Sequence, residues 1–160
     1  MIKSLIKIPL KLTSIQCSVI VIIRISMGLF FATTGFNKLF VEKNQLIMLE
    51  TIAEAGIPFP EFMSVFVSAA EFGFGLMLIM GLFTHLSSLV LSMICVVAFF
   101  TVGIHTIPAD LDTISWLSWF FYVHDLLYIL LLFVLLTHLP DDFTLDHHLL
   151  NYWSDKKGPE

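Results

Sequence analysis

The chain has 160 residues, of which 58% are hydrophobic and 13% are charged, and its formal net charge is −5. Soluble domains are typically about 45–50% apolar and about 25% charged, so this composition, with its mean hydropathy of +0.92, excludes an ordinary soluble domain and indicates a polytopic helical membrane protein. The negative charge lies mostly in loops and the tail and says little about nucleic acid, and no nucleic-acid partner is predicted. Two cysteines without C-x-x-C spacing exclude a disulfide framework.

Residues 1–14 are predicted to form a basic segment at the membrane surface. Lys3, Lys7 and Lys11 are four residues apart and share one helical face, while aliphatic residues cover another, which is typical of an interfacial helix. A cleaved signal peptide is the alternative interpretation. No A-x-A site follows, however, and the apolar run continues to about Phe40, which favours a first membrane span.

Residues 15–139 are predicted to form a domain of four transmembrane helices. At about 1.5 Å per helical residue, each apolar stretch is long enough to cross a hydrocarbon core of about 30 Å. The approximate ranges of these stretches are 15–36, 62–82, 86–104 and 114–136.

The connection between the first two spans, residues 40–61, carries too many charges to cross the bilayer. Leu46, Leu49 and Ile52 can share one helical face, with charged residues on another, and Gly56 is a stop signal. The fold class is therefore predicted to be an all-α membrane protein: a four-transmembrane-helix bundle with an amphipathic surface helix between spans one and two.

Residues 140–160 form a polar tail, which is predicted to lie in the cytoplasm together with the N-terminus. Four spans place both termini on the same side of the membrane. Lysines are more numerous on that side, at Lys3, Lys7, Lys11, Lys156 and Lys157, than on the other, at Lys38 and Lys43. The positive-inside rule then assigns the terminal side to the cytoplasm.

Ionisable residues inside the predicted spans are the candidate functional site. Glu71 is roughly 14 Å and Asp125, beside His124, roughly 16 Å from the outer ends of their spans, and Arg24 is roughly 10 Å from the cytoplasmic boundary. A charge at the bilayer centre costs roughly 2.5–3.5 kcal/mol, so these groups need partners. We predict an intramembrane ionic or proton site of Arg24, Glu71, His124 and Asp125, in which Arg24 pairs with Glu71.

Two interpretations of this site remain open at the level of the residues. The charges either form a structural clamp that fixes helix packing, or they exchange protons, for example with a quinol headgroup. Asn37 and Lys38, at the end of the first span, are candidates for an interface or headgroup site. The histidines are scattered along the chain, so no metal site is predicted.

Four motifs follow one another along the chain. The first span carries a spaced series, Arg24, Gly28, Phe31, Gly35 and Lys38. Residues 55–60 then read A-G-I-P-F-P. The second span carries Glu71, Gly75, Met77, Leu78, Gly81 and Leu82, and residues 140–147 read P-D-D-F-T-L-D-H. In order and spacing, these motifs resemble the DoxX family of small four-helix membrane proteins over about residues 15–150. His85, where the family often has arginine, and the Pro140-Asp141-Asp142 turn depart from its pattern.

The resemblance implies an oxidoreductase-associated subunit of the bacterial inner membrane, with quinone as the candidate cofactor and a soluble or peripheral redox partner. It carries over Arg24, Lys38 and Glu71 as site candidates, whereas His124 and Asp125 depend on depth alone. The chain has no recognisable cofactor motif, and its residues leave open whether it is itself catalytic.

Two other functions remain in view. The chain could be a non-catalytic membrane scaffold for a partner enzyme, or a small proton-coupled transporter that uses the buried acids. The transporter is the less favoured, because four spans without discontinuous helices or an internal repeat offer no evident pathway unless a homodimer supplies it.

Overall fold

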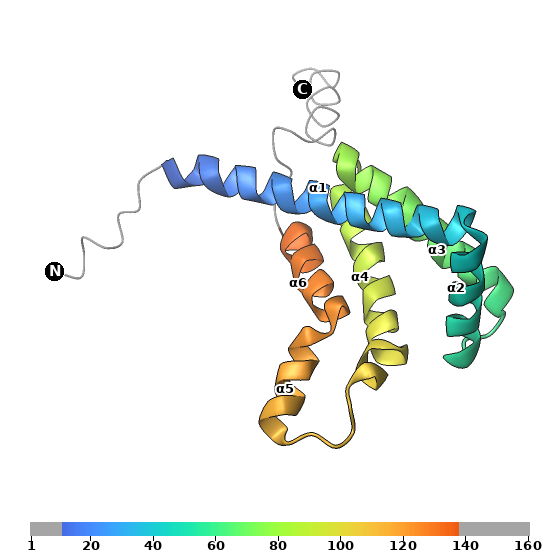
Figure 1. The fold of residues 1–160 in the computed structure, drawn as a ribbon. Helices are drawn as coiled ribbons and strands as arrows, with labels where there is room; N and C mark the ends of the chain where they lie inside the picture. The colour runs from blue at the N-terminus through green and yellow to red at the C-terminus, as the bar shows by residue number, and fades with distance from the viewer. Residues whose placement is uncertain (1–10, 138–160) are drawn as a thin grey trace, which may run out of the picture.

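The computed structural model describes residues 11–137, and this part of the chain consists of helices and the loops between them (Figure 1). In chain order the helices are α1 (Lys11–Phe40), α2 (Glu42–Glu54), α3 (Pro60–Met80), α4 (Thr84–Thr101), the 3-10 helix η2 (Gly103–Thr106), α5 (Thr113–Tyr122) and α6 (His124–Thr137). The predicted all-α fold is confirmed. Residues 1–10 and the predicted tail, 140–160, lie outside the described residues, whereas residues 11–14 already belong to α1.

Three helical segments are long and apolar enough to cross a membrane, namely Ser18–Phe40, Pro60–Met80 and Thr84–Thr101. They correspond closely to the first three predicted spans, because apolar length is a local property of the sequence. Large apolar side chains remain exposed on the outside of the molecule, as expected for helices that face lipid. The chain is therefore a multi-pass membrane protein.

The fourth predicted span is not one continuous helix, so the expectation that this span has no break is wrong. Its two halves, α5 and α6, meet at an angle of 57°, as a broken span or a re-entrant segment. The break is at Val123, whose backbone is extended at φ −65° and ψ 114°. Val123 is buried against Gly103 of η2, so a tertiary contact replaces helical continuity here.

The region between the first two spans contains the expected helix, α2, within the predicted range. It ends at Glu54, and Gly56 adopts the left-handed conformation with φ +70°, which confirms the predicted stop. α2 packs against both α1 and α3, with Ile52 buried and Leu46 exposed. Its location on the membrane surface stays a prediction.

The helices pack most closely as two pairs. α1 lies along α3, and α4 lies along α6, and the two pairs run in different directions in Figure 1. The buried core where the pairs meet consists of Met27, Phe31, Leu78, Leu91, Cys95, Leu132 and Leu135. Cys95 is a buried free thiol, as expected for a small core residue.

Candidate functional site

The centre of the candidate site is an ion pair between α1 and α3. The Lys38 ammonium donates hydrogen bonds to both carboxylate oxygens of Glu71, at 2.8 Å to Oε1 and 2.7 Å to Oε2. The Glu71 side chain is 7% exposed and the Lys38 side chain 31%. The carboxylate is therefore neutralised inside the protein by an ammonium that still reaches the surface.

Helix geometry explains why these two side chains meet. Helical side chains lean toward the N-terminus of their own helix. α1 and α3 are antiparallel neighbours, with Gly35 against the backbone of Ser68 and Phe72 and Gly28 against Gly75 and Ile79. Lys38 therefore leans inward from the end of α1, and Glu71 leans outward along α3, so the two charges converge.

The predicted pair between Arg24 and Glu71 is wrong. Gly35 lies against Ser68 and Phe72, which precede and follow Glu71 on α3. Arg24 is eleven residues before Gly35, roughly 16 Å along α1. The Arg24 side chain also leans away from Glu71. Arg24 is buried, but it lies near the middle of α1, fourteen residues before Lys38. Depths counted from the ends of the apolar runs suggested that Arg24 and Glu71 lie at the same level. The glycine contacts show how α1 is actually shifted along α3.

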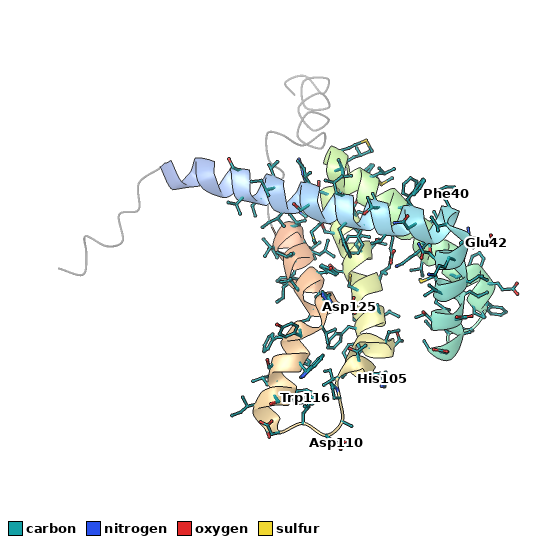
Figure 2. The ribbon with its side chains drawn as sticks, in the orientation of Figure 1. Phe40, Glu42, His105, Asp110, Trp116 and Asp125 are labelled. Atoms are coloured by element: carbon teal, nitrogen blue, oxygen red, sulfur yellow. The ribbon has the colours of Figure 1, made fainter. Side chains whose placement is uncertain are left out.

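Asp125 is the second acid of the candidate site. It lies in the first turn of α6, directly after the break, and is half-buried. Figure 2 shows it on the side of α6 that faces α4. Asp125 interacts electrostatically with its neighbour His124, with Lys38 and with Glu71. Helices α1, α3 and α6 thus bring two carboxylates and one ammonium together.

The other predicted site residues, His124 and Asn37, have exposed side chains, although His124 is adjacent to Asp125 and interacts electrostatically with it. His124 is exposed although Asp125 beside it is half-buried, because consecutive residues of a helix point in different directions. Asn37 is also exposed, so Lys38 alone of that pair reaches the interior. Within residues 18–137, whose side chains the structure describes, no group of three or more His, Cys, Asp or Glu residues could hold a metal ion.

A cavity of about 380 Å³ lies beside the ion pair, between the end of α1, α2 and the start of α3. Its polar lining consists of Lys38, Gln45, Glu61 and Ser64. The Gln45 amide donates a hydrogen bond to the Leu39 carbonyl oxygen, which ties α2 to the end of α1. Gln45, Glu61 and Ser64 were not predicted from the sequence, where the one signal is the i, i+3 spacing of Glu61 and Ser64 at the start of a span.

The fold and this cluster define a class: a small polytopic α-helical membrane protein with an ion pair buried between its spans. A family model described as DoxX matches residues 19–104, which is more than half of the chain and includes Lys38 and Glu71. The chain belongs to the DoxX family. No curated protein and no solved structure matches it.

Proposed function

We propose that this protein is the integral membrane subunit of a quinone-linked oxidoreductase, in which Lys38, Glu71 and Asp125 exchange protons. The observation that carries the proposal is the charge balance of the cluster. The Lys38 ammonium neutralises the Glu71 carboxylate but not Asp125 as well, so the uptake of one proton, by a carboxylate or by His124 beside Asp125, makes the cluster neutral inside the protein. Ionisable groups within membrane spans are expensive and are commonly parts of proton pathways.

The proposed step is the reduction of a quinone to its quinol, which consumes two electrons and two protons. A soluble or peripheral redox partner supplies the electrons. The cluster of Lys38, Glu71 and Asp125 delivers protons, and Lys38, whose side chain is 31% exposed, connects the cluster to the protein surface. Membership of the DoxX family supports an oxidoreductase context for this small membrane protein.

Quinone reduction by the complex isolated from native membranes through a tag on this chain tests the proposal. With a sulfur or thiol as electron donor, Glu71→Gln is expected to lower the rate of quinone reduction at least about tenfold. General acid–base catalysis typically contributes more than this to an enzymatic rate. Glu54→Gln, an exposed carboxylate on α2, is the matched control and should retain the wild-type rate. Both variants must assemble with the partner in normal amounts.

Two outcomes overturn the proposal. A complex that reduces no quinone analogue with these donors removes the quinone link. Full activity of Glu71→Gln and Asp125→Asn, combined with loss of activity on deletion of the chain, would identify the protein as a non-catalytic scaffold.

A small proton-coupled transporter is the second candidate, and the break at Val123 is the observation that favours it. Discontinuous helices commonly mark substrate and ion sites in transporters, and this break places Asp125 at a helix N-terminus. Proton-driven uptake into proteoliposomes, lost in Asp125→Asn, is the result expected for a transporter.

We further propose that the protein lies in the bacterial inner membrane with both termini in the cytoplasm. The lysine distribution supports this orientation, provided that α5 and α6 cross the membrane together and make the number of spans even. Terminal reporter fusions that are active in the cytoplasm are the expected result, and a periplasmic terminus would reverse the orientation.

A further inference from the structure

The cavity beside the ion pair lies where the polar and apolar parts of the protein meet. The first candidate span ends at Phe40 and the next begins at Pro60, and Lys38 and Glu61 are within one helical turn of these ends. By the length of the spans, this level corresponds to the boundary between the hydrocarbon core and the lipid headgroups. The cavity is therefore at the depth of a phospholipid headgroup.

The charges around the cavity select the kind of headgroup. Glu71 accepts two of the three N–H groups of the Lys38 ammonium, so one N–H remains and the positive charge is already balanced. Within residues 11–137, the Glu61 carboxylate makes no ion pair and lines the same cavity. A purely anionic ligand gains little here, whereas a ligand with an acceptor for Lys38 and a cation for Glu61 fits both groups.

We propose that this cavity binds the headgroup of an ethanolamine phospholipid. A phosphate oxygen accepts the remaining N–H of Lys38, and the primary ammonium donates to the Glu61 carboxylate. Leu46 and Leu49 on α2 and Val65 on α3 form the apolar wall beside the first part of the acyl chains. The site goes beyond the proposed redox function and does not depend on it.

The chemistry also distinguishes this lipid from its neighbours in a membrane. A glycerol headgroup leaves the phosphate charge uncompensated next to Glu61. A choline headgroup carries a quaternary ammonium, which has no N–H to donate to a carboxylate. The preference for the ethanolamine headgroup therefore depends on the charge of Glu61. The binding of any phospholipid in the cavity depends on the space beside Leu46.

Competition among lipids tests the proposal. The purified full chain is equilibrated with an equimolar mixture of phosphatidylethanolamine, phosphatidylglycerol and phosphatidylcholine, and the lipids retained are counted by native mass spectrometry. We expect roughly fivefold enrichment of phosphatidylethanolamine over each competitor, as a partly exposed ion pair allows. Glu61→Gln should abolish the enrichment, and Glu54→Gln, the same charge change away from the cavity, should preserve it.

A second pair of variants tests the location by filling the cavity. Leu46 and Ile47 are neighbours on α2 with similar exposure, 55% and 50%, but only Leu46 lines the cavity. Leu46→Trp should lower lipid retention at least about fivefold, and Ile47→Trp should leave it unchanged. Equal retention of the three lipids, preference for phosphatidylglycerol, or displacement of the lipid by a soluble quinone analogue would each overturn the proposal.

Discussion

The contact between α1 and α3 and the contact between η2, which follows α4, and the break before α6 are limited by different atoms. Between α1 and α3, a Cβ on Gly75 would lie 2.5 Å from the backbone nitrogen of Ala32, so backbone meets backbone. Near α4 and α6, a Cβ on Gly103 would lie 2.9 Å from Asp125 Oδ2 and from Val123 Cγ1, which are side-chain atoms. Side chains can rotate away, whereas a packed helical backbone cannot.

The two pairs also hold their acids differently. Glu71 is in the middle of a continuous helix, with both oxygens bonded to Lys38. Asp125 is beside a break and interacts with the pair at longer range. The family match, residues 19–104, contains the first arrangement and stops before α5. The closely packed α1–α3 pair thus fixes the position of Glu71, whereas the side-chain contacts around the break, which can rearrange, position Asp125.

The largest effect is expected from alanine at Gly35. Its Cβ would lie 2.8 Å from the Ser68 carbonyl oxygen and closer still to the Phe72 backbone nitrogen, so the helices must separate. Gly35→Ala should lower the free energy of unfolding in detergent by about 2–3 kcal/mol. Gly73→Ala, on α3 with open space around it, should instead stabilise by about 0.5–1 kcal/mol. Equal effects of the two changes would contradict the backbone contact.

Removal of the ammonium from the buried pair should have the next largest effect. Lys38→Met leaves the Glu71 carboxylate without its partner and should cost about 2 kcal/mol, less than a fully buried pair because Lys38 is 31% exposed. Glu71→Gln in the same chain should restore at least about 1 kcal/mol.

The same measurement distinguishes Lys38 from Arg24 as the partner. Arg24→Ala and Glu71→Gln should be additive to within about 0.5 kcal/mol, because the two residues are far apart. Strong coupling between Arg24 and Glu71, with none between Lys38 and Glu71, would refute the observed pairing.

Replacing Gly103 with alanine, as for Gly35, compares the cost of an added methyl group against side chains with its cost against backbone. Because Asp125 and Val123 can turn their side chains, Gly103→Ala should cost only about 1 kcal/mol, at the low end for added volume in a packed site. Thermal unfolding in the same detergent as for Gly35→Ala provides the measurement. A loss as large as that of Gly35→Ala would mean that the contact between η2 and the break before α6 is equally rigid.

The smallest effect on stability is expected from the Asp112 cap at the start of α5, and it should depend on pH. The Asp112 carboxylate accepts hydrogen bonds from the backbone N–H groups of Ile114 and Ser115. Hydrogen bonds from Ser115, first from its hydroxyl and then from its backbone N–H, hold the pKa of Asp112 below its usual range. Since the folded-state pKa is lowered, the stabilisation is complete above the unfolded-state pKa, about 3.9, and is lost as the pH falls through the folded-state value.

Hydrogen exchange measures this local effect. Protection of the Ile114 and Ser115 amides should be constant at neutral pH and decline only below about pH 4. Asp112→Ala should remove that protection at every pH, and Asp112→Asn should keep it without the acid-dependent decline. Asp110→Ala, in the same exposed loop, is the control and should change neither.

Local properties made most of the fold predictable. Apolar length identified the first three spans, and Gly56 correctly ended α2. Glu71 and Asp125 were recognised as candidates because charged groups are unusual inside apolar helices, and Lys38 through its place at the end of the first span and the family resemblance. The error concerned pairing, because depth counted from the ends of apolar runs contains no information on how one helix is shifted along another.

The sequence by itself determined that this protein is an all-α membrane protein of the DoxX family with acids inside its spans, because composition, apolar length and motif spacing are properties of a linear chain. Only the tertiary structure decided that Lys38, and not Arg24, neutralises Glu71, and that the last predicted span breaks at Val123. Both outcomes lie beside glycine contacts, that of Gly35 with α3 and that of Gly103 with Val123, where the absence of a side chain permits close approach. Such contacts join residues distant in the sequence, so no local pattern specifies them.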